Sequence, residues 1–197
     1  MVTLGNHTYR RDGISDYLAK SDRVIRPANA GALTSGTGLA VVEGANGVNV
    51  AVLNVLGSLF LDTPVSPWEV VDELVDEARR RAPVVVLDFH AEATSEKVAM
   101  ARWLDGRVTA VIGTHTHVQT NDARILPGGT AAITDAGMTG PHDSVIGVKT
   151  ELAISRMRTR LPIRFEPAEH GVRLEGVVVE CSDEGRARGI ELLRVDV

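Results

Sequence analysis

With 197 residues, 44% of them hydrophobic, the chain is long enough to bury one core, and a single domain is the default expectation. Its net charge of −5 and aromatic content of 4% argue against a broad nucleic-acid-binding face, although a small anionic substrate stays compatible with a site that carries metal ions. No apolar run approaches the ~20 residues that span a bilayer, and the single cysteine, Cys181, favours a reducing, cytoplasmic location.

The chain opens on apolar residues, 1–4, which have the pattern of the second half of a buried strand. Gly5, Asn6 and His7 follow at once. Independent domains seldom begin partway along a core strand. We therefore expect the domain to be N-terminally truncated in this chain, with its first segments missing.

Valine-rich runs alternate with helical patterns along the rest of the chain, which is typical of an α/β protein. Four runs predict strands covered on both faces, at 50–56, 84–89, 108–112 and 131–134. Ser66, Pro67 and Glu69 predict a helix that begins with a capping box, and three arginines at 79–81 suit its end. Further helices are expected from 94 or 95 to near 106 and over residues 150–160, followed by a C-terminal β hairpin or edge-strand pair at 172–181 and 188–197. No repeat or linker interrupts these elements, so one domain covers residues 1–197.

Three of the predicted strands run directly into histidines. The first leads into Asn6 and His7, the second into His90, and the third into His115 and His117. In parallel α/β sheets the carboxyl ends of the strands share one edge, where ligands bind. Neutral imidazoles and an asparagine carbonyl suit borderline divalent metals such as iron, manganese, zinc or cobalt. The pattern therefore predicts a metal site at this edge.

Ordinary structural roles compete with this interpretation. Six histidines in 197 residues give roughly 0.2 chance pairs at the spacing of 115 and 117, so an accidental pair is unlikely but not negligible. In favour of the metal site, an extended backbone would place both rings on one face. A lone histidine such as His90 is more often a hydrogen-bonded core residue. His142 and His170 stand in predicted loops and are expected to be solvated. Asp88 and Glu92 flank His90, where each is either an ordinary strand-end residue or an acceptor that orients a ligand imidazole.

The order of these blocks resembles the calcineurin-like metallophosphoesterases, whose pattern ends in GNH[DE], a lone histidine and GHxH. The matching residues are Gly5-Asn6-His7, then His90, then Gly113-Thr114-His115-Thr116-His117. Longer stretches are most similar to one bacterial subfamily, the dinuclear 2′,3′-cyclic-nucleotide 2′-phosphodiesterases; they are residues 3–8, 26–29, 88–97, 113–120, 125–130 and 134–141. The resemblance covers essentially the whole chain. It implies the layered α/β sandwich of the metallophosphoesterases.

The resemblance also implies roles for the matching residues. Asn6, His90 and His115 correspond to ligands of one metal, His117 to a ligand of a second metal, and His7 to the histidine that protonates the departing oxygen. The implied cofactors are two divalent ions, iron or manganese first and zinc or cobalt next. The family's upstream Asp and Glu-Asn blocks have no counterpart in this sequence, which corresponds to about two missing βα units. We therefore expect the chain to hold as few as one metal and to be a poor catalyst as it stands.

The function implied is that of a metal-dependent phosphodiesterase that hydrolyses 2′,3′-cyclic nucleotides or similar phosphodiesters, with a hydroxide shared by two metals as the nucleophile. Its expected partner is a small phosphodiester substrate; no membrane is involved, and assembly into a homo-oligomer is left open. Two alternatives stand beside it. One is a non-catalytic scaffold or regulatory homologue, and the other is a mononuclear histidine-site hydrolase acting on another bond.

Overall fold

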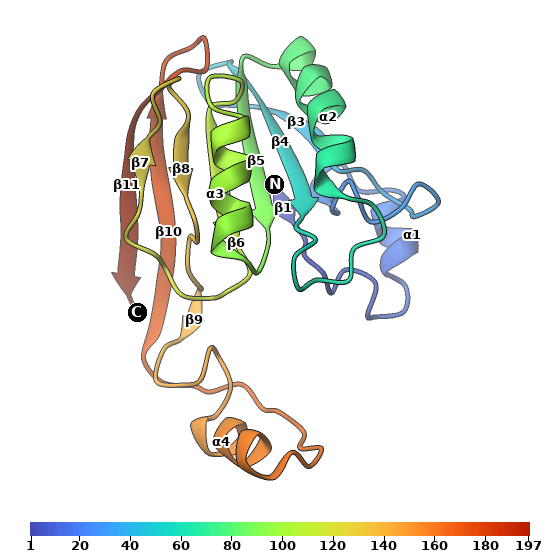
Figure 1. Ribbon diagram of the computed structural model, residues 1–197, viewed down its shortest axis with the longest axis vertical. Coiled ribbons are helices and arrows are strands. Elements are labelled where there is room, and N and C mark those ends of the chain that lie inside the picture. Colours follow the sequence, from blue (N-terminus) through green and yellow to red (C-terminus); the bar gives the residue numbers. More distant parts are fainter.

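The computed structural model describes residues 1–197, and a six-stranded sheet lies at its centre in the order β3-β4-β5-β6-β8-β7 (Figure 1). The strands are β3 (Leu39–Glu43), β4 (Asn49–Leu56), β5 (Val84–His90), β6 (Ala110–Thr114), β8 (Ala131–Ile133) and β7 (Arg124–Ile125). Strands β4, β5, β6 and β8 run parallel, and β3 and β7 close the two edges antiparallel. The parallel centre confirms the α/β class.

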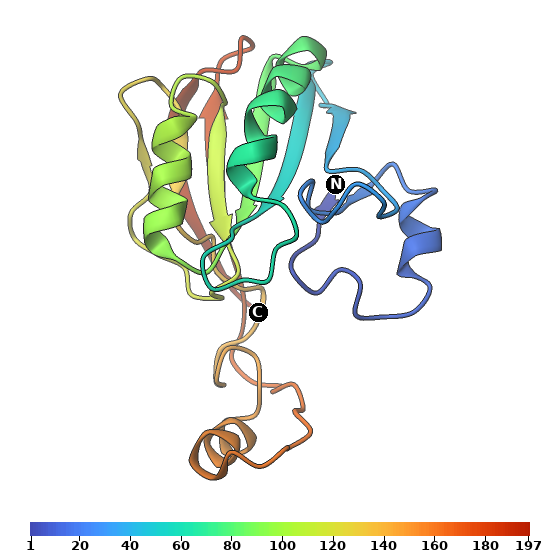
Figure 2. The same ribbon diagram turned by 45° about the vertical axis from the view of Figure 1, so that its right-hand side comes forward.

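Helices α2 (Pro67–Arg81) and α3 (Thr94–Trp103) cover one face of this sheet, as Figure 2 shows. The principal core lies between these helices and the sheet and contains 19 buried residues. Leu87 and Phe89 of β5 are fully buried in it. From α2 it receives Val71, which belongs to the apolar stripe expected of an amphipathic helix.

A second, three-stranded sheet covers the opposite face. It consists of the hairpin β10 (Val172–Cys181) and β11 (Ala187–Asp196), with β9 (Gly140–Pro141) at the edge of β10. Ala110 and Ala131 of the main sheet meet Ala187 of the hairpin in a small second core. The predicted C-terminal hairpin is therefore confirmed. With helices on one side and the hairpin on the other, the molecule has the layered α/β sandwich expected of a metallophosphoesterase.

The N-terminal segment differs from its prediction. Residues 2 and 3 form the short strand β1 (Val2–Thr3), which pairs only with β2 (Val24–Ile25), and α1 (Ile14–Leu18) lies between them. The expected buried strand is wrong, because this two-stranded sheet leaves the Val2 side chain 53% exposed. The segment is tied to the main sheet by Asn54 of β4, whose Nδ2 donates to the Leu4 carbonyl at 2.8 Å. This contact delivers the next residues, Gly5 to His7, to the edge where the parallel strands end.

Helix α4 (Thr150–Thr159) lies beyond the carboxyl ends of the main strands, on an extension that projects from the layers (Figure 1). It buries Ala153 alone. The single-domain organisation stays a prediction. The chain contains no helix with both the length and the apolar character that a bilayer crossing requires.

The predicted helix starts and ends lie within a few residues of those observed, but one local contact was wrong. Ser66 does precede α2, yet its hydroxyl caps no backbone group, and the Glu69 N–H is instead bound by the Ser66 carbonyl at 3.1 Å. Because Pro67 has no N–H to satisfy and fixes the first helical φ, the helix can begin without the side-chain bond.

Candidate metal centre

The predicted site residues come from three neighbouring pieces of backbone. His90 is the last residue of β5 and stands opposite Thr114, the last residue of β6, in the parallel register. His115 follows β6 directly, and Asn6 follows β1. The sheet therefore brings His90 and His115 to one edge for the reason expected from sequence, since parallel strands end on the same side. Asn6 reaches the same edge because Asn54 of β4 binds the Leu4 carbonyl.

Three donor atoms converge there. The Oδ1 atom of Asn6 lies 3.2 Å from Nε2 of His90, and Nδ1 of His115 lies 3.0 Å from the same nitrogen. Two ligands at right angles and about 2.1 Å from a metal are separated by about 3.0 Å. The spacing of Asn6, His90 and His115 thus fits neighbouring ligands of one divalent cation. The donor set also fits, because imidazole nitrogen is a preferred ligand of borderline metals.

Gly5 makes room for this arrangement. A Cβ atom at residue 5 would lie 2.3 Å from Cε1 and 2.5 Å from Nε2 of His90, far inside van der Waals contact. The imidazole of His90 therefore packs directly on the backbone of Gly5, and only glycine fits at this position.

A hydrogen-bonded chain orients His90 from behind. Its Nδ1 lies 3.2 Å from Oγ1 of Thr114, and that hydroxyl lies 2.6 Å from Oδ1 of Asp88. With the hydroxyl donating to the carboxylate, Nδ1–H donates to the hydroxyl, which leaves the Nε2 lone pair directed at Asn6 and His115. The sequence left Asp88 as either an ordinary strand-end residue or an acceptor that orients a ligand imidazole, and this geometry favours the second role. Asp88 acts on His90 through the Thr114 hydroxyl, a link that the sequence did not indicate.

Burial keeps His90 neutral. Desolvation, followed by the charges of His115 and Lys97, lowers the pKa of His90 to about 4. Desolvation also raises the pKa of the Asp88 carboxyl, against the lowering effect of its hydrogen bonds. An unprotonated imidazole is the form that binds a metal, so His90 is prepared for ligation at neutral pH.

Glu92 orients the second imidazole. Its Oε2 lies 3.0 Å from Nε2 of His115, on the far side of the ring from His90. The sequence suggested that Glu92 could orient a ligand imidazole. In the structure that imidazole is His115 and not His90, which lies two residues from Glu92 in the chain.

His115 and His117 contact different partners. Their backbones are not extended as expected: φ is 102° at His115 and 65° at His117, both in the left-handed region. His117 is exposed, and its Nδ1 lies 3.4 Å from the Ile146 carbonyl on the extension that carries α4. The i, i+2 argument for a shared face requires an extended backbone and therefore does not apply here, because β6 ends at Thr114 and the chain turns.

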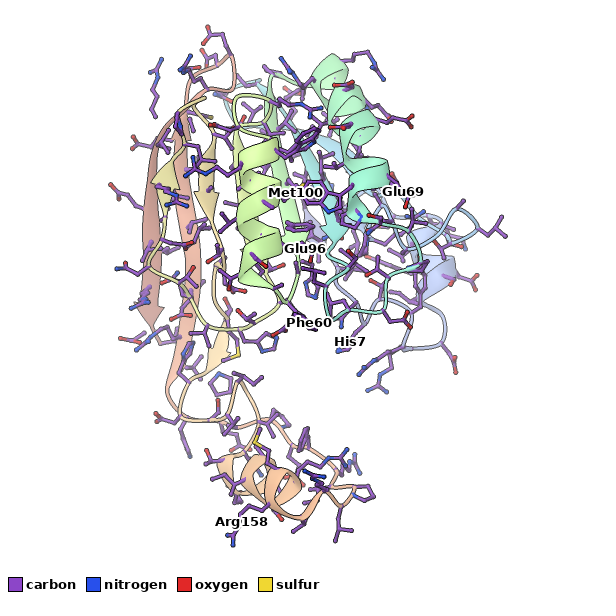
Figure 3. All side chains as sticks on the ribbon, viewed as in Figure 1. His7, Phe60, Glu69, Glu96, Met100 and Arg158 are labelled. Carbon is purple, nitrogen blue, oxygen red and sulfur yellow. The ribbon has the colours of Figure 1, made fainter.

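His7 stands at the open side of the cluster. Figure 3 shows it at the carboxyl-end edge of the main sheet, and its side chain is exposed. Partial burial, then the charges of Arg10 and His115, lower the pKa of His7. Its exposure fits contact with a substrate rather than enclosure by the protein.

Comparison with known proteins agrees with this geometry. Residues 1–193 match the model of the family described as YmdB-like protein. The chain belongs to the YmdB-like family. This membership confirms the resemblance to the calcineurin-like metallophosphoesterases.

Relatives of this YmdB-like chain have assigned names and solved structures. It is 46% identical over 194 residues to the 2′,3′-cyclic-nucleotide 2′-phosphodiesterase of Bacillus subtilis (strain 168), a match that covers 98% of this chain and 73% of the relative. A crystal structure of a hypothetical protein from Thermus thermophilus is 38% identical with a TM-score of 0.92, covering 100% of this chain and 76% of the other. A novel phosphatase from Mycoplasma pneumoniae is 34% identical with a TM-score of 0.86, covering 98% and 71%. The chain is thus a member of a phosphoesterase family.

The YmdB-like chain offers a limited set of side chains to a metal. No three His, Cys, Asp or Glu side chains are grouped closely enough to hold an ion by themselves. The converging set is instead two imidazoles and one amide oxygen, so Asn6 is the third donor. Of the four ligands predicted from sequence, Asn6 and His115 both contact Nε2 of His90, whereas the polar contact of His117 is with the Ile146 carbonyl. The assignment of the four as ligands stays a prediction.

Two further predictions concern histidines away from this cluster. His170 is exposed as expected. His142 is not fully solvated: its side chain is 24% exposed, with Nε2 3.3 Å from the Met138 carbonyl and 4.0 Å from Glu175. The hairpin strand β10, which carries Glu175, covers the loop of His142 and accounts for the difference.

A polar hollow lies away from this cluster. A hollow of about 180 Å³ opens at the amino ends of β5 and β6, between Arg79, Arg107 and Arg186, and none of the predicted site residues lines it. The site is therefore defined by converging donors at the carboxyl edge rather than by cavity size.

Proposed function

We propose that this chain is a metal-dependent phosphodiesterase that hydrolyses 2′,3′-cyclic nucleotides or similar small phosphodiesters. The observation that supports it best is the convergence of Asn6 and His115 on Nε2 of His90, at 3.2 and 3.0 Å. The 46% identical relative is named for the same reaction. In this proposal a divalent cation is held by the three donors, with His117 as ligand of a second ion.

The chain's own residues have separable tasks. A bound divalent ion supplies Lewis-acid stabilisation of the charge that develops on the phosphate oxygens. His90 presents a neutral nitrogen because Asp88 and Thr114 fix its tautomer. His7, exposed beside these donors, gives a proton from its imidazolium to the departing ribose oxygen. Its lowered pKa makes that imidazolium a stronger acid than an ordinary histidine.

The contacts among Asn6, His90 and His115, which do not include His117, support one competing function. A site with a single metal, held by Asn6, His90 and His115, is the mononuclear histidine-site hydrolase. A metal count separates it from the proposed dinuclear phosphodiesterase.

The test is to purify the chain in manganese, determine metal per chain by elemental analysis, and assay 2′,3′-cyclic AMP hydrolysis. We expect bound metal and slow but measurable phosphodiesterase turnover in the wild type, in keeping with the poor catalysis expected from the sequence, with both lost in His115→Ala. Gly176→Ala serves as the control, because nothing lies within 4 Å of a Cβ added there. Metal without turnover on any cyclic nucleotide would reject the phosphodiesterase, and absence of both would favour the scaffold.

A further inference from the structure

A buried ion pair lies directly behind the turn that carries His115. Nζ of Lys97, on α3, is 2.9 Å from Oδ2 of Asp135, and the two side chains are only 4% and 1% exposed. Lysine and aspartate side chains are rarely buried unless they are paired, because removing their charges from water is costly. We therefore expect this pair to support a particular part of the fold.

The pair is bonded to the residue between the two histidines. Oδ2 of Asp135 accepts the backbone N–H of Thr116 at 3.0 Å and its hydroxyl at 2.7 Å, in addition to Lys97. The other oxygen, Oδ1, accepts the Gly137 N–H at 3.0 Å. Apart from the pairing with Lys97, these contacts of the carboxylate fix either the turn or the segment after β8.

The turn needs such support. His115 and His117 both have positive φ, a backbone conformation that residues other than glycine seldom adopt. Residues in this region persist only where the surrounding structure determines them, and Thr116 stands between the two. Its two bonds to Asp135 are the contacts that anchor the middle of the turn to the fold.

Lys97 reaches Asp135 through a gap in β6. A Cβ at Gly113 would lie 3.1 Å from Cδ of Lys97 and 1.9 Å from the Thr134 carbonyl. The absence of a side chain at Gly113 thus admits both the lysine stem and the close passage of the β8 backbone. Three separate parts of the chain, α3, β6 and the end of β8, are shaped around this ion pair.

We infer that Asp135, held in place by Lys97, is a positioning residue that sets the backbone of the His115–His117 turn and so directs the His115 imidazole at His90. The inference rests on the proposed function only in taking His115 as a metal ligand. Asp135 acts through Thr116 and contacts no donor atom of the site.

The test compares Thr116→Val, which removes the hydroxyl but leaves the ion pair, with Thr130→Val as the matched control. Thr130 is a fully buried threonine, whereas Thr116 is partly buried. The Thr130 hydroxyl donates to the Val108 carbonyl and accepts the Gly106 N–H at the opposite edge of the sheet. Asp135→Asn is the second variant, made with Lys97→Met so that no lysine charge is left buried alone. Cobalt(II) affinity is measured by calorimetry, and the histidine side-chain ¹⁵N–¹H signals are recorded in metal-free protein.

We expect Thr116→Val and the double variant to bind cobalt roughly 10- to 100-fold more weakly, and to shift or broaden the His115 signals, with Thr130→Val unchanged in both. Wild-type His115 signals and wild-type affinity in Thr116→Val and the double variant would overturn the inference. If the wild type binds no cobalt, the proposed metal site fails, and the His115 signals alone decide the positioning role. Equal changes in Thr130→Val would show a general loss of structure and would also overturn it.

Discussion

Gly5→Ala is the sharpest perturbation of the site, because it adds one carbon and removes no donor. The added Cβ would lie 2.3, 2.5 and 2.8 Å from Cε1, Nε2 and Nδ1 of His90. To restore ordinary contact at about 3.4 Å, the ring or the backbone of residue 5 must move by about 1 Å. The ring cannot tilt freely, since Thr114 holds Nδ1 and His115 faces Nε2.

Two effects follow from this overlap. Overpacking of this kind costs about 1–3 kcal/mol of folding free energy. Displacement of His90 from Asn6 should weaken metal binding roughly 10- to 100-fold, or about 1.4–2.7 kcal/mol of binding free energy. Because all three donors are still present, the loss would come from geometry alone.

The assay is cobalt or manganese titration by calorimetry, with urea denaturation of the metal-free protein alongside. Gly176→Ala is the control, since an alanine there meets no atom within 4 Å. If Gly5→Ala binds metal as tightly as the wild type, the direct packing of His90 on the residue 5 backbone does not determine the site, and the argument for Gly5 is refuted.

Four other predictions test the remaining residues. His7→Ala should lower kcat strongly for a poor leaving group and less for a very good one, at unchanged metal content; an equal loss for both would reject the proton-donor role. His117→Ala should retain the metal of the converging donors, whereas His115→Ala should lose it, as elemental analysis of both variants will show. Burial holds the pKa of His90 at about 4, so below the ordinary histidine range the unfolded chain binds more protons than the folded one. The unfolding free energy of the metal-free protein should therefore fall as pH drops toward 4, and His90→Asn should flatten that fall in urea titrations. Phe89→Ala should lower the unfolding free energy by about 3–5 kcal/mol, because Phe89 is fully buried in the principal core; a loss below about 1 kcal/mol would contradict that packing.

Local sequence patterns were sufficient for the main elements. The valine-rich runs correspond to β4, β5, β6 and β8, and the amphipathic pattern after Ser66 corresponds to α2. Such patterns succeed because burial on both faces, or along one helical stripe, dictates the residue types directly. The short strands β1 and β2 show the opposite case: their pairing leaves Val2 exposed, so apolar composition alone did not determine burial.

For the site, sequence determined which residues reach the edge, and the tertiary structure decided which atoms meet. The ends of parallel strands locate His90 and His115 without any knowledge of side-chain contacts. The orientation of each ring depends on partners distant along the chain: Glu92 holds His115, and Thr114 links Asp88 to His90. The left-handed backbone at His115 and His117 belongs to a turn anchored by Asp135, whose contact with Lys97 joins residues 38 positions apart. Hydrogen bonds of this kind are set by strand register and by how closely the layers approach, and both arise only when the whole sheet is assembled.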